Sequence, residues 1–279
     1  MVLNPLTYLS WGARSLWGLD VGVFGAARCL AERQRQRHRP RQEESAPLTE
    51  TQRAGRLIAR PEHPTDNAPL GLQPLGLASP CDGLLYVPPS YRPDQPAAFL
   101  LMLHGATGVG LFALWPIILF ANVHNMIVLA PDSRGRTWDR VHATFGPDVT
   151  FVDQALEFVF SRYAVDPDRL GIGGFSDGAS YALSLGLTNG DLFKKVVAFS
   201  PGFMAPGERV GRPPVFISHG DDDTVLPVAC SQRLAPRLRA EGYDVTYAEF
   251  SGGHVVPVGT AGQAVEWLTD YKRVLGAGG

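Results

Sequence analysis

Residues Gly174 to Gly178 read G-F-S-D-G, and the run A-S-Y-A-L-S-L follows directly. An apolar stretch, Leu170–Phe175, precedes the serine, so the pattern predicts a strand, a sharp turn at Ser176 and then a helix. The flanking glycines permit such a turn and let neighbouring backbone approach closely. A serine on this turn has its Oγ lifted clear of the sheet, where a base can activate it as a nucleophile. The alternative is a glycine-rich strand-to-helix turn with an idle serine.

Short apolar segments alternate with helical segments on both sides of this turn. Strands are predicted at 84–87, 99–104, 126–130, 170–175, 196–200, 215–219 and 245–250, and helices at 111–123, 149–163, 178–187, 228–241 and 261–274. This alternation predicts an α/β fold with a mostly parallel central sheet flanked by helices. Functional groups of such sheets gather at the carboxyl ends of the strands. Segment 40–80 lacks apolar periodicity and is rich in Pro, Gly and charge, so we expect a linker or wrapping coil there.

The composition is that of a folded, water-soluble chain. It has 279 residues, of which 45% are hydrophobic and 19% charged, and this excludes a disordered protein. No run of about 18 apolar residues predicts a membrane-spanning helix. Residues 1–60 contain ten arginines and five acids, whereas residues 61–279 contain fifteen basic and twenty-two acidic residues. The acidic body argues against nucleic acid as a partner.

Two later strands end in residues that complete the set a nucleophilic serine needs. The last predicted strand runs into S-G-G-H, and His254 is the only histidine after His219, so His254 is the predicted base. The strand before it runs into G-D-D-D-T-V-L-P, which offers Asp221, Asp222 and Asp223 as the acid that orients the histidine. We favour Asp223 because the T-V-L-P after it resembles the residues that usually follow an acid with this role. The other two aspartates then cap or solvate the turn.

The stretch H-G-A-T-G, from His104 to Gly108, follows the end of another predicted strand. A backbone N–H of this loop is expected to bind the oxyanion formed in acyl transfer, together with the N–H of Asp177 at the helix start. Ala106 is the candidate, since only its main chain is needed. His104 itself is more simply explained as a buried histidine that bonds to backbone and holds the loop.

These motifs together resemble the α/β-hydrolase superfamily, in particular the lidless serine esterases of the phospholipase/carboxylesterase and polyhydroxybutyrate-depolymerase-like group. The resemblance is carried by L-L-M-L-H-G-A-T-G, A-P-D-S-R-G-R-T-W-D, G-G-F-S-D-G-A-S-Y-A-L-S-L-G-L, S-H-G-D-D-D-T-V-L-P and G-G-H. It implies an α/β-hydrolase catalytic domain at 55–279, preceded by an extension at 1–54. The roles that it implies are nucleophile for Ser176, base for His254, orienting acid for Asp223, and main-chain oxyanion donor for Ala106 and Asp177.

The resemblance implies a serine hydrolase that cleaves carboxylic esters through an acyl-enzyme intermediate, without a metal or organic cofactor. A thioesterase, a lysophospholipase or a polyester depolymerase would use the same three residues, and the motifs do not separate these activities. Outside enzymes, the alternative is a catalytically silent α/β-hydrolase that serves as a binding module. The serine, the acid and the histidine are nevertheless all present.

An open site without a large lid is expected, because only Pro201–Pro214 joins two strands where lids of this superfamily often enter. Phe203 and Met204 are then expected near the rim. Trp138 and Phe145, in the long segment before the helix at 149–163, either line an acyl or alcohol pocket or simply pack the loop. An open, partly aromatic cleft favours short acyl esters or accessible polymer chains over long buried triglycerides.

The amino-terminal residues and the cysteines bear on location. Residues 1–30 are fairly apolar but interrupted by charges and lack a basic n-region, so no cleaved signal peptide is predicted. With the arginines that follow, residues 1–41 suggest either a peripheral membrane anchor or a dispensable solvated extension. Cys29, Cys81 and Cys230 are too sparse for a disulfide framework or a zinc site, which favours a reducing, cytoplasmic location.

Overall fold

The structure is a computed structural model, and it describes residues 48–270 except 63, 65–67, 78, 80 and 143. Most of the predicted extension at 1–54, including the stretch interpreted as a membrane anchor, lies outside the described residues. The same holds for the last four residues of the helix predicted at 261–274. No helix within the described residues is long and apolar enough to cross a bilayer.

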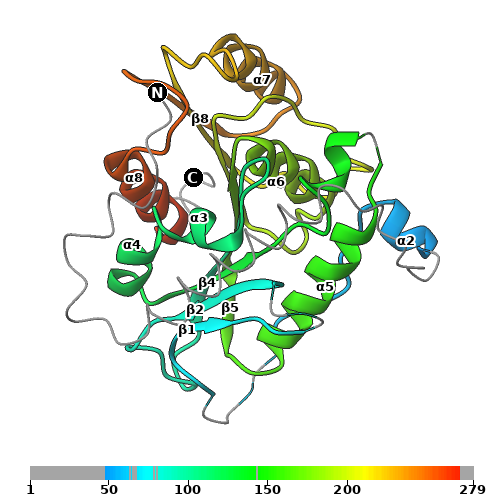
Figure 1. Cartoon of the computed structure of the whole chain (residues 1–279), viewed down its shortest axis with the longest axis vertical. Helices are drawn as coiled ribbons and strands as arrows, with labels where there is room; N and C mark the ends of the chain where they lie inside the picture. The colour runs from blue at the N-terminus through cyan, green and yellow to red at the C-terminus, as the bar shows by residue number, and fades with distance from the viewer. Residues whose placement is uncertain are drawn as a thin grey trace, which may run out of the picture.

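Within the described residues, an eight-stranded sheet runs through the molecule in the order β1-β2-β4-β3-β5-β6-β7-β8 (Figure 1). β2 pairs antiparallel with both β1 and β4, and the remaining neighbours are parallel. The predicted mostly parallel sheet is therefore confirmed. The strands are β1 (Gly71–Pro74), β2 (Gly83–Val87), β3 (Ala97–Leu103), β4 (Met126–Pro131), β5 (Val165–Phe175), β6 (Lys195–Phe199), β7 (Val215–Gly220) and β8 (Val245–Phe250).

Helices cover both faces of this sheet, as predicted. α3, α4 and α8 contribute to one buried apolar cluster, and α5, α6 and α7 contribute to the other. Figure 1 shows α3, α4 and α8 on one side of the sheet and α5 on the opposite side. The helices are α2 (Glu50–Arg53), α3 (Gly110–Leu114), α4 (Ile118–Val123), the 3₁₀ helix η2 (Asp139–His142), α5 (Pro147–Phe160), α6 (Asp177–Thr188), α7 (Ala229–Ala240) and α8 (Val258–Thr269).

Two sequence predictions need correction. The single helix predicted at 111–123 is divided into α3 and α4, because Pro116 lies in the turn between them. A proline has no N–H to donate and its ring clashes with the preceding turn, so one continuous helix is disfavoured. The linker predicted at 40–80 contains α2 and the edge strand β1, whose Leu72 pairs with Tyr86 of β2. A four-residue edge strand is too short to show periodicity and depends on its neighbour for pairing.

The cysteine prediction is also wrong in part. Cys81 is disulfide-bonded, whereas Cys230 is a free cysteine. The predicted cytoplasmic location rested partly on reduced cysteines, and the pairing of Cys81 removes that support.

The topology brings three chain segments to one edge of the sheet. β5, β6, β7 and β8 are adjacent and parallel, so their carboxyl ends lie side by side. Ser176 follows β5, the three consecutive aspartates follow β7, and His254 follows β8 by four residues. Residues that are up to 78 positions apart in sequence are thereby placed within hydrogen-bonding distance.

Candidate active site

The turn between β5 and α6 holds Ser176 in a rare backbone conformation. Its φ of 58° and ψ of −122° lie outside the regions that non-glycine residues usually adopt, and its N–H donates to Phe199 O at 2.9 Å. A Cβ on Gly174 would lie 2.2 Å from the carbonyl oxygen of Gly178. A Cβ on Gly178 would lie 2.3 Å from Leu103 O. Both glycines are therefore required by close backbone contacts, and the turn has the sharpness that the sequence predicted.

Ser176, His254 and Asp223 form a line of hydrogen bonds. Oγ of Ser176 lies 2.9 Å from Nε2 of His254, and Nδ1 of His254 lies 2.6 Å from Oδ2 of Asp223. An ionised carboxylate only accepts, so Nδ1 carries the hydrogen and Nε2 is left to accept from the serine hydroxyl. This is the arrangement in which a histidine can take the proton of a serine.

The three consecutive aspartates have different surroundings. Asp223 is buried against His254, and its Oδ1 accepts the N–H groups of Val225 and Leu226, each at 2.9 Å. Asp221 is exposed and accepts the N–H of Gly252 at 3.0 Å. Among these three residues, Asp223 is thus the one whose carboxylate faces the histidine, as the sequence favoured.

Hydrogen bonds keep Asp223 ionised despite its burial. Burial alone would raise the pKa of this carboxyl. The hydrogen bonds from His254 and from the backbone of Leu226 and Val225 outweigh burial, so the pKa lies below its ordinary value. A negative charge next to Nδ1 favours a histidine that gains a proton at Nε2.

The loop after β3 lies against the serine. A Cβ added to Gly105 would be 3.2 Å from Cβ of Ser176. Thr107 donates its N–H to Arg136 O at 2.8 Å, so that group is already used. No acceptor within the described residues takes the N–H of Ala106 or of Asp177. Both N–H groups therefore lack a partner within the described residues, and Asp177 adds the positive end of α6; their role as oxyanion donors stays a prediction.

His104 holds this loop in place. The imidazole is buried, its Nδ1 donates to Gly105 O at 2.7 Å, and its Nε2 accepts the N–H of Ser133 at 3.0 Å. Trp138 donates from Nε1 to His104 O at 2.8 Å. The interpretation of His104 as a buried residue that bonds to backbone is confirmed.

Comparison with known proteins places this geometry in a family context. Residues 140–269 match the family model described as phospholipase/carboxylesterase. The structure of esterase PE8 superposes with a TM-score of 0.56 at 24% sequence identity, covering 67% of this chain and 97% of that one.

The chain has the α/β-hydrolase fold, and its residues 140–269 are similar to the phospholipase/carboxylesterase family.

Two curated relatives match parts of this chain. Acyl-protein thioesterase 1 of Gibberella zeae is 29% identical over 98 residues, which are 32% of this chain and 42% of that protein. Probable feruloyl esterase C of Aspergillus niger is 31% identical over 113 residues, which are 40% of this chain and 41% of that protein. The chain thus spans about two fifths of the length of the curated relatives it matches.

The four residues predicted to line a substrate pocket are mostly packed inside the protein. Trp138 is fully buried and stacks on Tyr181 with ring centroids 5.2 Å apart. Phe145 is buried edge-on against the same tyrosine, and Met204 is buried in the core. Phe203 is half-buried. The packing alternative therefore holds for Trp138 and Phe145, and the pocket interpretation of these two residues is not supported.

A row of buried hydroxyls on α6 was missed from the sequence. Ser180, Ser184 and Thr188 accept backbone N–H groups of Gly202, Ala205 and Gly207 at 2.9–3.0 Å. The hydroxyls also donate to carbonyls one turn earlier in α6. They tie the segment 202–207 to the helix that follows Ser176, so this segment is a fixed wall rather than a lid. Hydroxyl residues at four-residue spacing on a buried helix face were the available signal.

Two carboxyls, the buried Asp148 and the half-buried Asp139, brace the segment between β4 and α5. Asp139 and Asp148 each accept the backbone N–H of the other, at 2.7 and 2.8 Å, and Asp148 also accepts the N–H of Arg134. Burial, together with the nearby Asp139, raises the pKa of Asp148 to about 7. This pair supports the segment that carries Trp138 and Arg136, which in turn contact the loop after β3 at His104 and Thr107.

The stability contributed by Asp148 is expected to fall as pH rises from about 4 to about 7. In this interval the folded protein keeps a proton on Asp148 that the unfolded chain, with an ordinary pKa of 3.8, has released. Raising the pH therefore favours unfolding, and above about 7 the full penalty applies. Urea unfolding of Asp148→Asn and wild type at pH 5 and 7.5 measures this. The wild type should lose more stability than the variant over this interval, and Asp94→Asn, at an exposed site, should behave like wild type. Equal pH slopes for Asp148→Asn and wild type would contradict the prediction.

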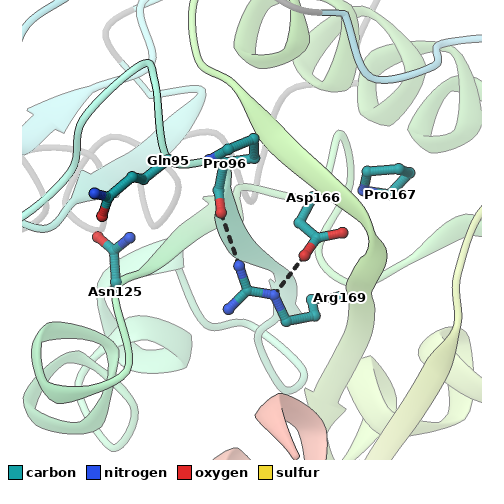
Figure 2. A pocket seen from close by; sticks show the side chains of 6 residues that line it. All are labelled: Gln95, Pro96, Asn125, Asp166, Pro167 and Arg169. Carbon is teal, nitrogen blue, oxygen red and sulfur yellow. Dashed lines mark hydrogen bonds and ion pairs between the residues drawn. The ribbon is translucent and has the colours of Figure 1, made fainter. Parts of the chain in front are cut away.

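A cavity of about 560 Å³ lies at the other end of the sheet and does not belong to the candidate site (Figure 2). It is lined by Gln95, Pro96, Asn125, Asp166, Pro167 and Arg169, which precede or begin strands β3, β4 and β5. Arg169 there donates to Asp166 and to Pro96 O, so its guanidinium is bonded to other residues that line the cavity. Ligands of open parallel sheets bind at the carboxyl ends of the strands, and this cavity is at the amino ends.

Proposed function

We propose that the chain is a serine hydrolase that cleaves carboxylic esters by two-step acyl transfer. The observation that carries the proposal is the line of hydrogen bonds from Ser176 through His254 to Asp223, on a strained strand-to-helix turn. The names of the matched relatives, an acyl-protein thioesterase and a feruloyl esterase, support the same class of reaction.

In the first step, Oγ of Ser176 attacks the ester carbonyl while Nε2 of His254 takes the hydroxyl proton. The C=O becomes a tetrahedral oxyanion, which the N–H groups of Ala106 and Asp177 stabilise. When the tetrahedral intermediate collapses, the bond to the alkoxy oxygen breaks and His254 gives its proton to the leaving alcohol. The acyl group is then attached to Ser176.

In the second step, water replaces the alcohol. His254 takes a proton from the water as its oxygen attacks the acyl carbonyl, and the same two N–H groups bind the second oxyanion. Collapse releases the carboxylic acid and returns the proton from His254 to Ser176. Asp223 remains ionised throughout and holds the imidazole in the tautomer with hydrogen on Nδ1.

Access to the site supports small or well-exposed esters. The side chain of His254 is 14% exposed, and its ring contacts Phe175 at a centroid distance of 4.6 Å. The segment 202–207 is fixed to α6, so it does not close over the serine as a lid. We therefore propose short-chain or polymeric esters as substrates. A thioesterase is the second candidate, favoured by the match to acyl-protein thioesterase 1.

Intact-mass measurement after treatment with a fluorophosphonate tests the proposal. The reagent phosphonylates an activated serine, so the wild type should gain one adduct and Ser176→Ala should gain none. Ser180→Ala, one helical turn away, is the matched control and should still be labelled at Ser176. An unlabelled wild type, or a labelled Ser176→Ala, would refute the proposed nucleophile. Matched p-nitrophenyl esters and acyl thioesters of increasing chain length then separate the two candidate activities.

A further inference from the structure

A second histidine lies directly beside the acid. His219 is at the end of β7, four residues before Asp223, and both side chains are fully buried. Its Nε2 lies 2.7 Å from the carbonyl oxygen of Leu226 and 3.2 Å from Oδ2 of Asp223. A carbonyl oxygen only accepts hydrogen bonds, so Nε2 must carry the hydrogen, which it donates to Leu226 O beside the carboxylate.

The other nitrogen of this ring is also occupied. Nδ1 of His219 lies 2.7 Å from Oγ of Ser231, a fully buried residue of α7. A neutral imidazole has one donor and one acceptor nitrogen, so Nδ1 accepts from the serine hydroxyl when Nε2 carries the hydrogen. Ser231 therefore stabilises the tautomer whose N–H is donated to the Leu226 carbonyl, next to the acid.

With His219 included, both oxygens of the Asp223 carboxylate have close partners. Its Oδ1 accepts two backbone N–H groups of the turn, from Val225 and Leu226. Its Oδ2 lies between two imidazoles, 2.6 Å from Nδ1 of His254 and 3.2 Å from Nε2 of His219. The same N–H of His219 reaches the carbonyl of Leu226, so it also closes the turn that supplies the Oδ1 contacts.

We propose that His219 is a positioning residue for the reaction. Its Nε2–H holds the carbonyl of Leu226, whose own N–H bonds to Oδ1 of Asp223, and its ring lies against Oδ2, so that the carboxylate stays aligned with Nδ1 of His254. The inference rests on the proposed function. No proton passes to or from His219 in this role, since its N–H remains on the Leu226 carbonyl. Its effect is to spare the Asp223 side chain any reorganisation while His254 gains and loses a proton.

The test uses two amide variants that place a donor at different positions. The amide nitrogen of His219→Gln reaches the position of Nε2 and retains a donor for the Leu226 carbonyl beside Asp223, whereas that of His219→Asn reaches only the position of Nδ1. Rates are measured with p-nitrophenyl butyrate and expressed per site titrated with fluorophosphonate. We expect His219→Asn to lower kcat about 10- to 100-fold with KM little changed, because it loses the hydrogen bond that holds the turn around the carboxylate. His219→Gln should retain most of the wild-type kcat.

Repeating His219→Asn in an Asp223→Asn background separates positioning from general damage. If His219 acts through the carboxylate, its loss should lower kcat by less than about 3-fold once that carboxylate is gone. Equal losses in both backgrounds, or equal kcat for the Gln and Asn variants, would overturn the inference. A wild type that is neither labelled nor active would instead refute the proposed function, so the two failures are distinguishable.

Discussion

Asp223→Asn is expected to lower kcat for p-nitrophenyl butyrate about 10⁴-fold while KM stays close to the wild-type value. The asparagine oxygen can still accept the N–H groups of Val225 and Leu226, which leaves its NH₂ group directed at His254. An NH₂ group donates, so Nδ1 of His254 must become the acceptor and the hydrogen moves to Nε2. The nitrogen that faces Ser176 then cannot take its proton.

The neighbouring aspartates provide the control for this variant. Asp222→Asn changes an exposed carboxylate by the same chemical step and should keep kcat within about 3-fold of wild type. Asp221→Asn leaves one side-chain oxygen that can accept the N–H of Gly252, and its kcat should also stay within about 3-fold of wild type. Stopped-flow or steady-state assays with unfolding curves for each variant measure this. If Asp222→Asn or Asp221→Asn produced the large loss and Asp223→Asn did not, the assignment of the acid would be wrong.

The order of strands and helices could be predicted because the apolar runs are well separated and the G-F-S-D-G turn marks the end of one strand and the start of a helix. β3, the part of β5 from Leu170 to Phe175, and β6 are nearly continuous apolar segments, as strands buried on both faces must be. The glycines around Ser176 are needed by backbone contacts that any strand-to-helix turn of this sharpness makes. Ser176 could be predicted as the nucleophile from its G-F-S-D-G turn. His254 could be predicted as the base from chain order, since it is the only histidine after His219.

The features that escaped prediction depend on contacts between distant segments. Pairing of Cys81 depends on the distance between two cysteines, which sequence spacing does not give. Trp138 looked available for a pocket, but its indole N–H is used by His104 O and its ring is stacked on Tyr181. His219 precedes the acid by four residues, and only the turn through Leu226 brings its Nε2 next to the carboxylate.

Gly178→Ala is expected to destabilise the protein by about 3 kcal/mol or more, beyond the usual range for overpacking, because the obstructing atoms are backbone. The new Cβ would lie 2.3 Å from Leu103 O and 2.5 Å from His104 O, distances that real Cβ atoms do not show. Relief requires α6 to move away from the end of β3. That movement would separate the N–H of Asp177 from the Ala106 loop, so fluorophosphonate labelling should slow along with the loss of stability.

Gly259→Ala is the matched control, since Gly259 is also a helical glycine near the start of its helix. No atom lies within 4 Å of a Cβ at this position of α8, so the substitution should be neutral or stabilising by about 0.5–1 kcal/mol. Urea unfolding gives the stability of both variants, and the rate of labelling reports the geometry around Ser176. A Gly178→Ala variant as stable and as quickly labelled as Gly259→Ala would contradict the close packing of α6 against β3. If Gly178→Ala were as stable as wild type but slowly labelled, the altered part would be the loop after β3, because the serine and its base would still be in place.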